Sequence, residues 1–262
     1  MDGLEGASER LTSDRRARRL RRFWRTLPSA PRCKLCTSPF GPPIGPILRL
    51  VGKGRWPGNP AYCSGCFQYL YRHREGAEVD CSLLFADVRG STRLAETMTA
   101  NAYRALLDRF YAAVSEVLVN AEAVVDKFVG DEVVAIFIPA LAGGGHALRA
   151  VDAARGILRA TGHVDREPWI PVGVGVNTGR AYVGAVGTAE HVEFTALGDA
   201  VNVTARLASA AGPGEVLITE STLRSAGLTP NGLEHRRLEL RGKSAPTDVF
   251  VVSAAGLPSV PA

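Results

Sequence analysis

The stretch VVDKFVGDEVVAIF, residues 124–137, decides the fold prediction for this chain. Its two arms are rich in valine, isoleucine and phenylalanine, which favour a pleated and mostly buried strand. Gly130-Asp131 lies between the arms and is typical of a two-residue hairpin loop. The sequence therefore predicts a β-hairpin with a carboxylate at its tip.

Lys127 lies in the first arm of this hairpin. The two-residue period of a strand places Val125, Lys127 and Val129 on one face, where a lysine costs desolvation unless an anionic group meets it. With a two-residue loop, Lys127 pairs with Val134 and lies roughly 10 Å from Asp131 along the strand. We therefore expect Lys127 and Asp131 to contact different groups; a solvated hairpin is the simpler alternative.

The composition bounds the class of protein. The chain has 262 residues, of which 46% are hydrophobic, which suits one full domain and a smaller module. No apolar run reaches the roughly 18 residues of a membrane helix, and no signal peptide opens the chain. We therefore expect a cytoplasmic protein without an integral membrane segment.

Positive charge is concentrated at the N-terminus. Residues 1–76 hold 15 lysines and arginines against 5 acidic residues, whereas residues 77–262 hold 16 against 21. The basic net charge is therefore no sign that the main domain binds nucleic acid. Residues 1–30 contain a run of arginines, for which we expect a flexible, solvated arm. The alternative is a basic helix that contacts an anionic membrane surface, an acidic protein or nucleic acid.

Residues 31–76 carry two CxxC pairs, Cys33/Cys36 and Cys63/Cys66. Each pair can turn two thiolates toward one ion, and four thiolates complete a tetrahedral zinc shell. The glycine- and proline-rich segment between the pairs has little to stabilise it without such a cross-link. We predict a small zinc-binding module with four cysteine ligands; an iron–sulfur cluster, redox-active thiols and ordinary reduced cysteines are the alternatives.

Residues 77–254 are expected to form the main domain, and residues 255–262 a loose tail. Periodicity predicts the element order β-α-α-β-β-α-β-β-α-β-α-β-β. Two of these strands, residues 171–177 and 181–187, are expected to be joined by a turn at Thr178-Gly179-Arg180. The order implies a mixed sheet with packed helices, which is an α+β fold built on a split βαβ core.

The segment FADVRGST, residues 85–92, supplies a second carboxylate. Asp87 ends a predicted core strand, and the glycine-containing turn that follows can hold phosphate with its amide groups. Asp87 and Asp131 together could bind the divalent ions that accompany a triphosphate. Taken alone, an aspartate before such a turn is more often a helix cap.

The chain resembles class III nucleotidyl cyclase catalytic domains in the order and spacing of four segments. They are residues 85–92, 127–131, 177–187 and 195–207. The resemblance covers about residues 79–253. It implies a ferredoxin-like palm that forms a head-to-tail homodimer with composite active sites. It also implies an adenylate cyclase that converts ATP to 3′,5′-cyclic AMP and pyrophosphate with two Mg²⁺ or Mn²⁺ ions in each site.

The same resemblance implies a role for each matching position. The metal ligands are the carboxylates of Asp87 and Asp131 and the main-chain carbonyl of Val88. Asn202 would orient the ribose and Arg206 would stabilise the reacting phosphate, four residues apart on one helix face, while Lys127 and Thr195 would read the purine and Arg180 and Arg241 would hold the triphosphate. In each composite site, one chain would supply Asp87, Asp131 and Arg180, and the other Lys127, Thr195, Asn202 and Arg206.

Thr195 departs from the aspartate that many family members carry at this position. A hydroxyl is a weaker acceptor than a carboxylate, so the expected preference for adenine over guanine is loosened. A bacterial subgroup has threonine or serine there, so the site is not expected to be inactive. The alternatives are a cyclase that also uses GTP and a catalytically weak or inactive signalling module. A diguanylate cyclase is a third alternative, although it gives the Asn202/Arg206 helix no role.

Overall fold

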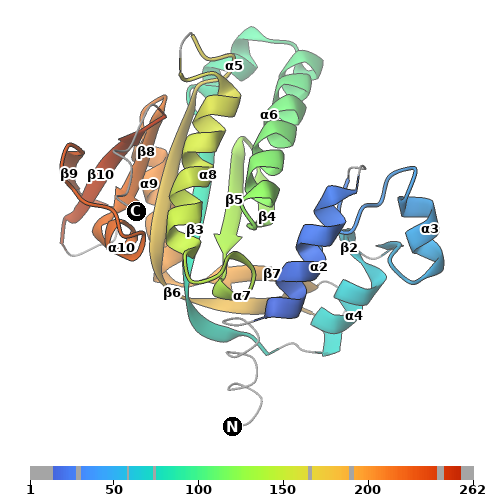
Figure 1. The fold of residues 1–262 in the computed structure, drawn as a ribbon. Helices are drawn as coiled ribbons and strands as arrows, with labels where there is room; N and C mark the ends of the chain where they lie inside the picture. Colours follow the sequence, from blue (N-terminus) through green and yellow to red (C-terminus); the bar gives the residue numbers. More distant parts are fainter. Residues whose placement is uncertain are drawn as a thin grey trace.

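The computed structural model describes residues 14–27, 31–57, 59–72, 75–164, 167–188, 192–240 and 245–254. The tail expected at residues 255–262 lies outside these ranges. Within them, an eight-stranded sheet has the order β4-β5-β3-β6-β8-β10-β9, and β7 pairs with β6 outside this path (Figure 1). The pairings are antiparallel except that of β6 with β8. The predicted α+β class with a mixed sheet is confirmed.

The strands of this sheet are β3 (Ala77–Val88), β4 (Val124–Val129), β5 (Glu132–Phe137), β6 (Val172–Gly187), β7 (Val192–Leu197), β8 (Glu215–Thr219), β9 (Glu234–Leu238) and β10 (Thr247–Ser253). The helices between them are α5 (Ser91–Thr97), α6 (Ala100–Asn120), α7 (Pro139–Ala142), α8 (His146–Thr161), α9 (Asp199–Ala210) and α10 (Glu220–Ser225). Across the described ranges, no helix has both the length and the apolar composition to cross a membrane.

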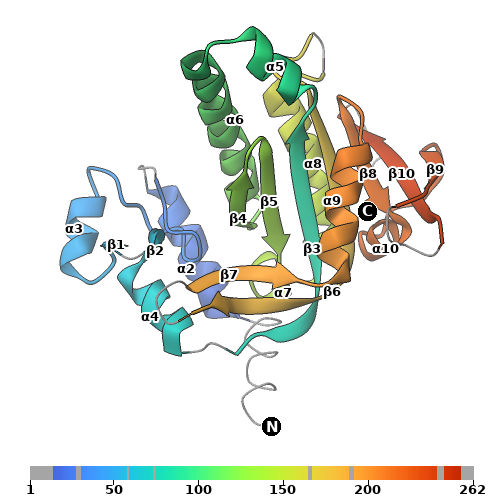
Figure 2. The same ribbon diagram turned by 180° about the vertical axis from the view of Figure 1, so that it is seen from behind.

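Helices cover both faces of the sheet. Figure 1 shows α6 and α8 in front of it, and Figure 2 shows α9 on the opposite face. Leu84 and Ala86 of β3 are buried with residues of α6 and α8, whereas Phe85 is buried with Val134 and Ala208 on the α9 side. This alternation is the two-residue period of a strand that is buried on both faces.

The course of β6 differs from the prediction. Instead of two strands joined at Thr178-Gly179-Arg180, β6 runs unbroken from Val172 to Gly187. It pairs with β3 from Ala77↔Val183 to Val88↔Val172. The neighbouring strand β3 keeps Thr178, Gly179 and Arg180 in its ladder, and this pairing outweighs the local turn signal. The far end of β6 pairs with β7, which was not predicted.

Two glycines of β6 allow α9 to lie directly on the sheet. A Cβ atom at Gly175 would be 2.4 Å from the main-chain nitrogen of Ala208 and 2.7 Å from the carbonyl oxygen of Thr204. A Cβ atom at Gly173 would be 2.6 Å from the carbonyl oxygen of Ala211. Because only glycine lacks this atom, Gly173 and Gly175 set the distance between α9 and the sheet.

The cysteine-containing segment packs onto the same fold. Its elements are α3 (Gly45–Leu50), β1 (Arg55–Trp56), β2 (Asn59–Cys63) and α4 (Ser64–Arg72). Tyr62 and Phe67 are buried in one cluster with Val183 and Phe194 of the main sheet. The Tyr62 hydroxyl also accepts a hydrogen bond from the main-chain nitrogen of Phe194 at 3.0 Å. The division expected near residue 76 therefore separates two parts of the sequence that share one core.

Residues 15–26 form a docked helix and not the solvated arm expected for residues 1–30. This helix, α2 (Arg15–Thr26), begins after Asp14, whose side chain accepts a hydrogen bond from the main-chain nitrogen of Ala17 at 2.7 Å. Figure 1 shows α2 between the β4–β5 hairpin and the cysteine-containing segment. Residues 1–13 and 28–30 lie outside the described ranges.

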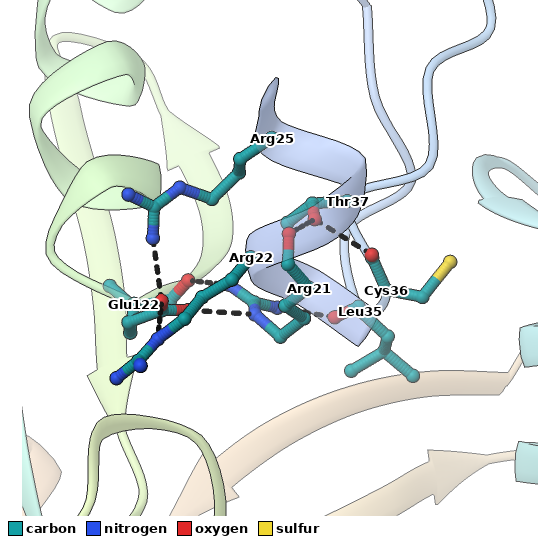
Figure 3. A network of polar contacts seen from close by, with 8 residues as sticks. Arg21, Arg22, Arg25, Leu35, Cys36, Thr37 and Glu122 are labelled. Atoms are coloured by element: carbon teal, nitrogen blue, oxygen red, sulfur yellow. Dashed lines mark hydrogen bonds and ion pairs between the residues drawn. The ribbon is translucent and has the colours of Figure 1, made fainter. Parts of the chain in front are cut away.

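The arginines of α2 explain this docking. Glu122, whose side chain is 3% exposed, pairs with Arg21, Arg22 and Arg25 at 3.5, 3.6 and 2.6 Å (Figure 3). A buried carboxylate is costly unless it is paired, and α2 supplies three guanidinium groups. Part of the arginine run thus serves an internal contact. For the arginines of α2 that stay exposed, an anionic surface or partner remains a prediction.

Gly175→Ala tests the close packing of α9 on β6. We expect this variant to lose about 1–3 kcal/mol of unfolding free energy, because α9 or β6 must shift to admit the Cβ atom. Urea unfolding followed by circular dichroism measures the loss. Gly144→Ala is the matched control, since no atom lies within 4 Å of a Cβ there. Equal stability of the two variants would contradict the packing role of Gly175.

Candidate active site

The predicted hairpin is present, with β4 and β5 as its arms. Lys127 pairs with Val134 across the hairpin, as the two-residue loop requires. Gly130 has a φ of 60°, in the left-handed region that favours glycine. The Nζ atom of Lys127 lies 3.5 Å from the carboxylate of Asp126. Within the described ranges Lys127 forms no ion pair with Asp131, in agreement with the expected separation of these two residues.

Asp126 interrupts the regular alternation of β4. Val125 pairs with Ala135 and Lys127 with Val134, so Asp126 is an extra residue in a β-bulge. The prediction that Val125 and Lys127 share one face is therefore wrong. Val125 packs against the core under α6 and α8, whereas Lys127 lies opposite Val134 on the α9 side.

The two aspartates predicted as metal ligands are brought together where β3 ends and the β4–β5 hairpin turns. Asp87 is the last residue but one of β3 and pairs with Glu132, the residue that follows Asp131. The main-chain nitrogen of Val88 donates to the carbonyl oxygen of Asp131 at 3.3 Å. The hairpin tip is thereby fastened to the end of β3, and three carboxylates gather there. We call Asp87, Asp131 and Glu132 the acidic edge.

Arg89 is the basic side chain at the acidic edge. Its guanidinium pairs with the carboxylate of Asp87 and donates to the carbonyl oxygen of Ser209 in α9 at 3.0 Å. Burial lowers the pKa of Arg89, against the opposing charges of Asp131 and Glu132. Burial also raises the pKa of Glu132, and the charge of Asp131 adds to this shift. The acidic edge already binds one cationic group, the guanidinium of Arg89. Its carboxylate oxygens are also the ligands that Mg²⁺ and Mn²⁺ prefer.

Lys127 and Thr195, the predicted purine-reading residues, lie side by side. The hydroxyl of Thr195 donates to Oδ2 of Asp126 at 2.7 Å, and the Nζ atom of Lys127 lies 3.5 Å from the same oxygen. Two groups that contact one oxygen at these distances are no more than about 6 Å apart. Their spacing is compatible with two adjacent polar atoms on one edge of a purine ring. Of the two, the Lys127 side chain is more open to solvent, since Thr195 is buried.

Asp126 and Lys34 complete this cluster, and neither was among the predicted site residues. The Nζ atom of Lys34 lies 2.8 Å from Oδ1 of Asp126 and also donates to the carbonyl oxygen of Asp126. The side chains of Lys34 and Asp126 are 8% and 3% exposed. An aspartate next to a lysine in an apolar strand was the only signal available. The contact itself joins residues 92 positions apart, which no local pattern reports.

Helix α9 carries the two predicted catalytic residues. Asn202 is exposed and Arg206 is half-buried. Val203 and Leu207, one position further along in each case, are buried. Because residues four apart lie on one side of a helix, Asn202 and Arg206 share the side of α9 that its own sheet does not cover.

Arg180 is not brought to the acidic edge. It lies on β6 opposite Asp80, seven residues before Asp87 on β3, which is roughly 20 Å along the strand. Its exposed side chain contacts Glu78 at 3.2 Å. The expected grouping of Arg180 with Asp87 and Asp131 of the same chain is therefore corrected, because β6 continues past the predicted turn. Arg241 lies outside the described residues.

The four cysteines predicted to bind zinc converge. Their Sγ atoms all lie within 4.8 Å of one another, and those of Cys36 and Cys63 are 3.7 Å apart. Sulfur atoms around a tetrahedral zinc ion with Zn–S bonds of about 2.3 Å are about 3.8 Å apart. The main-chain nitrogens of Cys63 and Cys66 donate to the sulfur atoms of Cys33 and Cys63 at 3.3 and 3.4 Å. The cluster therefore fits one zinc ion.

Comparisons with known sequences agree with this geometry. Residues 75–253 match the family model of the adenylate and guanylate cyclase catalytic domain. The terminal-differentiation-specific adenylate cyclase of Dictyostelium discoideum is 28% identical over 183 residues, which are 65% of this chain and 8% of that protein. An adenylate cyclase of Anabaena cylindrica is 27% identical over 188 residues, 66% of this chain and 36% of that protein. An uncharacterised protein of Mycobacterium tuberculosis is 32% identical over 185 residues, 67% of this chain and 33% of that protein. The chain thus spans little more than a third of these relatives, or less.

Solved structures share the fold. The guanylyl cyclase Cya2 matches 70% of this chain and 96% of its own, with a TM-score of 0.63 and 25% identity. The adenylyl cyclase CyaB from P. aeruginosa matches 68% of this chain and 96% of its own, with a TM-score of 0.59 and 28% identity. One relative is named for each purine at similar identity, so the likeness does not choose between ATP and GTP. The matched residues include the acidic edge, the predicted purine-reading pair and α9, and the chain belongs to the adenylate and guanylate cyclase family.

Proposed function

We propose that this chain is an adenylate cyclase that converts ATP to 3′,5′-cyclic AMP and pyrophosphate. The contact between the Lys127 ammonium group, Asp126 and the Thr195 hydroxyl carries this proposal. Adenine has an acceptor at N1, which an ammonium group can bind, and an amino group at C6, which a hydroxyl oxygen can bind. Guanine has a proton on N1 and an oxo group at C6, so Lys127 gains no hydrogen bond from N1. This supports ATP as the preferred substrate.

The acidic edge is the proposed metal site. The carboxylates of Asp87 and Asp131 and the carbonyl of Val88 would hold two Mg²⁺ or Mn²⁺ ions, which lower the pKa of an attacking hydroxyl and bind leaving phosphates. The Arg89 guanidinium now pairs with Asp87 and must move aside. Once released from Asp87, the Arg89 guanidinium would be near the metal site and would bind the phosphates, the role that Arg180 was expected to fill.

The side chains of α9 act on the reacting atoms. Asn202 orients the ribose so that its 3′-oxygen lies in line with the α-phosphorus and the pyrophosphate leaving group. Arg206 presents a guanidinium to the transferring phosphate, where negative charge grows as the oxygen attacks. A fixed cation at this place lowers the energy of the transition state more than that of bound ATP.

A head-to-tail homodimer would assemble these parts. Lys127 and Asp131 are separated within one chain, and the catalytic side of α9 is not covered by its own sheet. Val129, beside the acidic edge, is 54% exposed, and Leu197, beside Thr195, is 49% exposed. These apolar side chains support a contact between two chains. One chain would supply Asp87 and Asp131, and its partner Lys127, Thr195, Asn202 and Arg206.

Asp87→Ala and Asp131→Ala test the activity and its metal site. Purified protein with Mn²⁺ is expected to form cyclic AMP and pyrophosphate from ATP in equal amounts. Each variant should lose at least about a hundredfold in kcat, because one lost metal ligand removes several kcal/mol of transition-state stabilisation. Glu96→Ala on α5 is the control, since Glu96 is an exposed carboxylate that is not part of the acidic edge. Substantial activity in either aspartate variant would contradict the assignment of Asp87 and Asp131 as metal ligands. Faster turnover of GTP than of ATP by the unmodified protein would contradict the preference for adenine.

Mixing two inactive variants tests the shared site. Asp87→Ala and Asn202→Ala homodimers have two dead sites each, but their heterodimer collects both changes in one site and leaves the other intact. After free subunit exchange at equal amounts, about half the dimers are mixed, so roughly a quarter of the original activity should return. Differently tagged chains verify the exchange. Tagged heterodimers without recovered activity would contradict the composite site.

The cysteine cluster is proposed to bind one structural Zn²⁺ per chain. Elemental analysis of protein purified without added metal is expected to give one zinc per chain. Cys36→Ser should lower the zinc content and the melting temperature, because the free energy of metal binding contributes to the stability of the folded segment. Cys81→Ser is the control for loss of a buried thiol outside the cluster. Iron with visible absorption, or no bound metal and reactive thiols, would replace this assignment.

A further inference from the structure

The Asp126 carboxylate contacts three groups that could donate a proton. Lys34 lies 2.8 Å from one oxygen, and Thr195 and Lys127 lie 2.7 and 3.5 Å from the other. Lys34 is 8% exposed, whereas the Lys127 side chain is 40% exposed. The buried lysine is therefore the closer counter-ion, and the exposed lysine is the part of the cluster open to solvent.

This arrangement determines which way the Thr195 hydroxyl points. An ionised carboxylate can only accept hydrogen bonds, and a hydroxyl has a single proton to donate. Because Thr195 gives that proton to Asp126, its oxygen has only lone pairs left for a ligand. Such an oxygen can accept from the 6-amino group of adenine, but it repels the 6-oxo group of guanine.

Lys34 is held against Asp126 by the first cysteine pair. It lies between Cys33 and Cys36, and its main-chain nitrogen donates to the carbonyl oxygen of Ala61 at 2.8 Å. Arg21 of α2 makes a second connection, because it donates to the carbonyl oxygen of Leu35 (Figure 3). It also donates, at 2.7 Å, to the carbonyl oxygen of Ala123, the residue before β4. The cysteine segment thus contacts Asp126 directly through Lys34, and Arg21 links it to the residue before β4.

We propose that Asp126 is a specificity-determining positioning residue, which turns the Thr195 hydroxyl into an obligate acceptor for adenine, and that Lys34 of the cysteine module maintains it in this role. The proposal rests on the adenylate cyclase function proposed above. Lys34 has a second effect, since it neutralises Asp126 and leaves Lys127 available for N1 of the base. Without Lys34, Lys127 is the remaining ammonium group beside Asp126 and is drawn toward the carboxylate.

Asp126→Asn is the direct test. An amide can donate to Thr195 as well as accept from it, so the hydroxyl becomes free to present its proton to the guanine oxygen. We expect the ratio of kcat/KM for ATP to that for GTP to fall about ten- to a hundredfold, the range for losing a hydrogen bond to a charged group. The change should lie in KM, with kcat for ATP altered by about twofold or less, because Asp126 acts on the base and not on the reacting phosphate.

Lys34→Met separates the role of the cysteine module from that of Asp126. It keeps the carboxylate but removes its buried counter-ion, so Lys127 is drawn away from the base. We expect KM for ATP to rise about tenfold and the purine ratio to fall. Arg72→Met is the matched control, because it removes one positive charge from an exposed position on α4 of the same segment. That variant should keep the purine ratio and both kinetic constants for ATP.

A structural role alone predicts a different result. In that case Asp126→Asn and Lys34→Met lower the melting temperature but leave the purine ratio within about twofold of the original, and this outcome overturns the proposal. If Asp126→Asn does not fold, the Lys34→Met result decides by the same ratio.

Equilibrium binding of 3′-deoxy-ATP and 3′-deoxy-GTP, which lack the attacking hydroxyl, separates this proposal from the function on which it rests. Absence of cyclic nucleotide formation by the unmodified protein refutes the cyclase function. The purine proposal then stands or falls on binding: it requires tighter binding of 3′-deoxy-ATP by the unmodified protein and loss of that preference in Asp126→Asn. Equal binding of the two analogues by the unmodified protein refutes it.

Discussion

The buried carboxylate of Asp126 joins the cyclase domain to the N-terminal cysteine segment, and the fold of both parts depends on this contact. A carboxylate that is 3% exposed is tolerated only with a counter-ion and hydrogen-bond donors. Lys34 provides the first from the cysteine segment, and Thr195 provides the second from β7. Three parts of the chain that are distant in sequence must therefore come together before this charge is satisfied. The same contacts position Lys127 and Thr195, the two proposed purine-reading residues.

A second buried acid repeats this arrangement four residues earlier. Glu122 precedes β4 and meets three arginines of α2, so the start of β4 is bracketed by two carboxylates with N-terminal counter-ions. These ion pairs explain part of the uneven distribution of charge along the chain. The excess of basic residues in residues 1–76 and of acidic residues in residues 77–262 is partly an attraction between the two parts of one molecule.

The proposed site residues gather on and above the face of the sheet that α9 covers. Lys127, Val134, Phe85 and Gly175 form one row across β4, β5, β3 and β6 by their pairing, and directly opposite residues share a face. The absence of a side chain at Gly175 brings α9 onto this row. Asn202 and Arg206 then lie above the same face that carries Asp87. Close packing of one helix thus sets the height of Asn202 and Arg206, the proposed catalytic residues, over the sheet.

The sequence by itself determined those features that depend on local periodicity and short spacing. The hairpin with Asp131 at its tip and the shared helix side of Asn202 and Arg206 follow from residues close together in the chain. The two CxxC pairs also predicted the cysteine cluster, because the spacing within each pair is typical of metal ligands. The tertiary structure alone decided the bulge at Asp126, the contact with Lys34, the docking of α2 and the distance of Arg180 from the acidic edge. A bulge shifts the alternation of a strand by one residue, and the types of residue in the strand do not reveal it. An ion pair between residues 92 positions apart leaves no periodic pattern in the sequence. Such features follow from satisfying buried charges and hydrogen bonds across the whole fold, and therefore only the assembled structure reveals them.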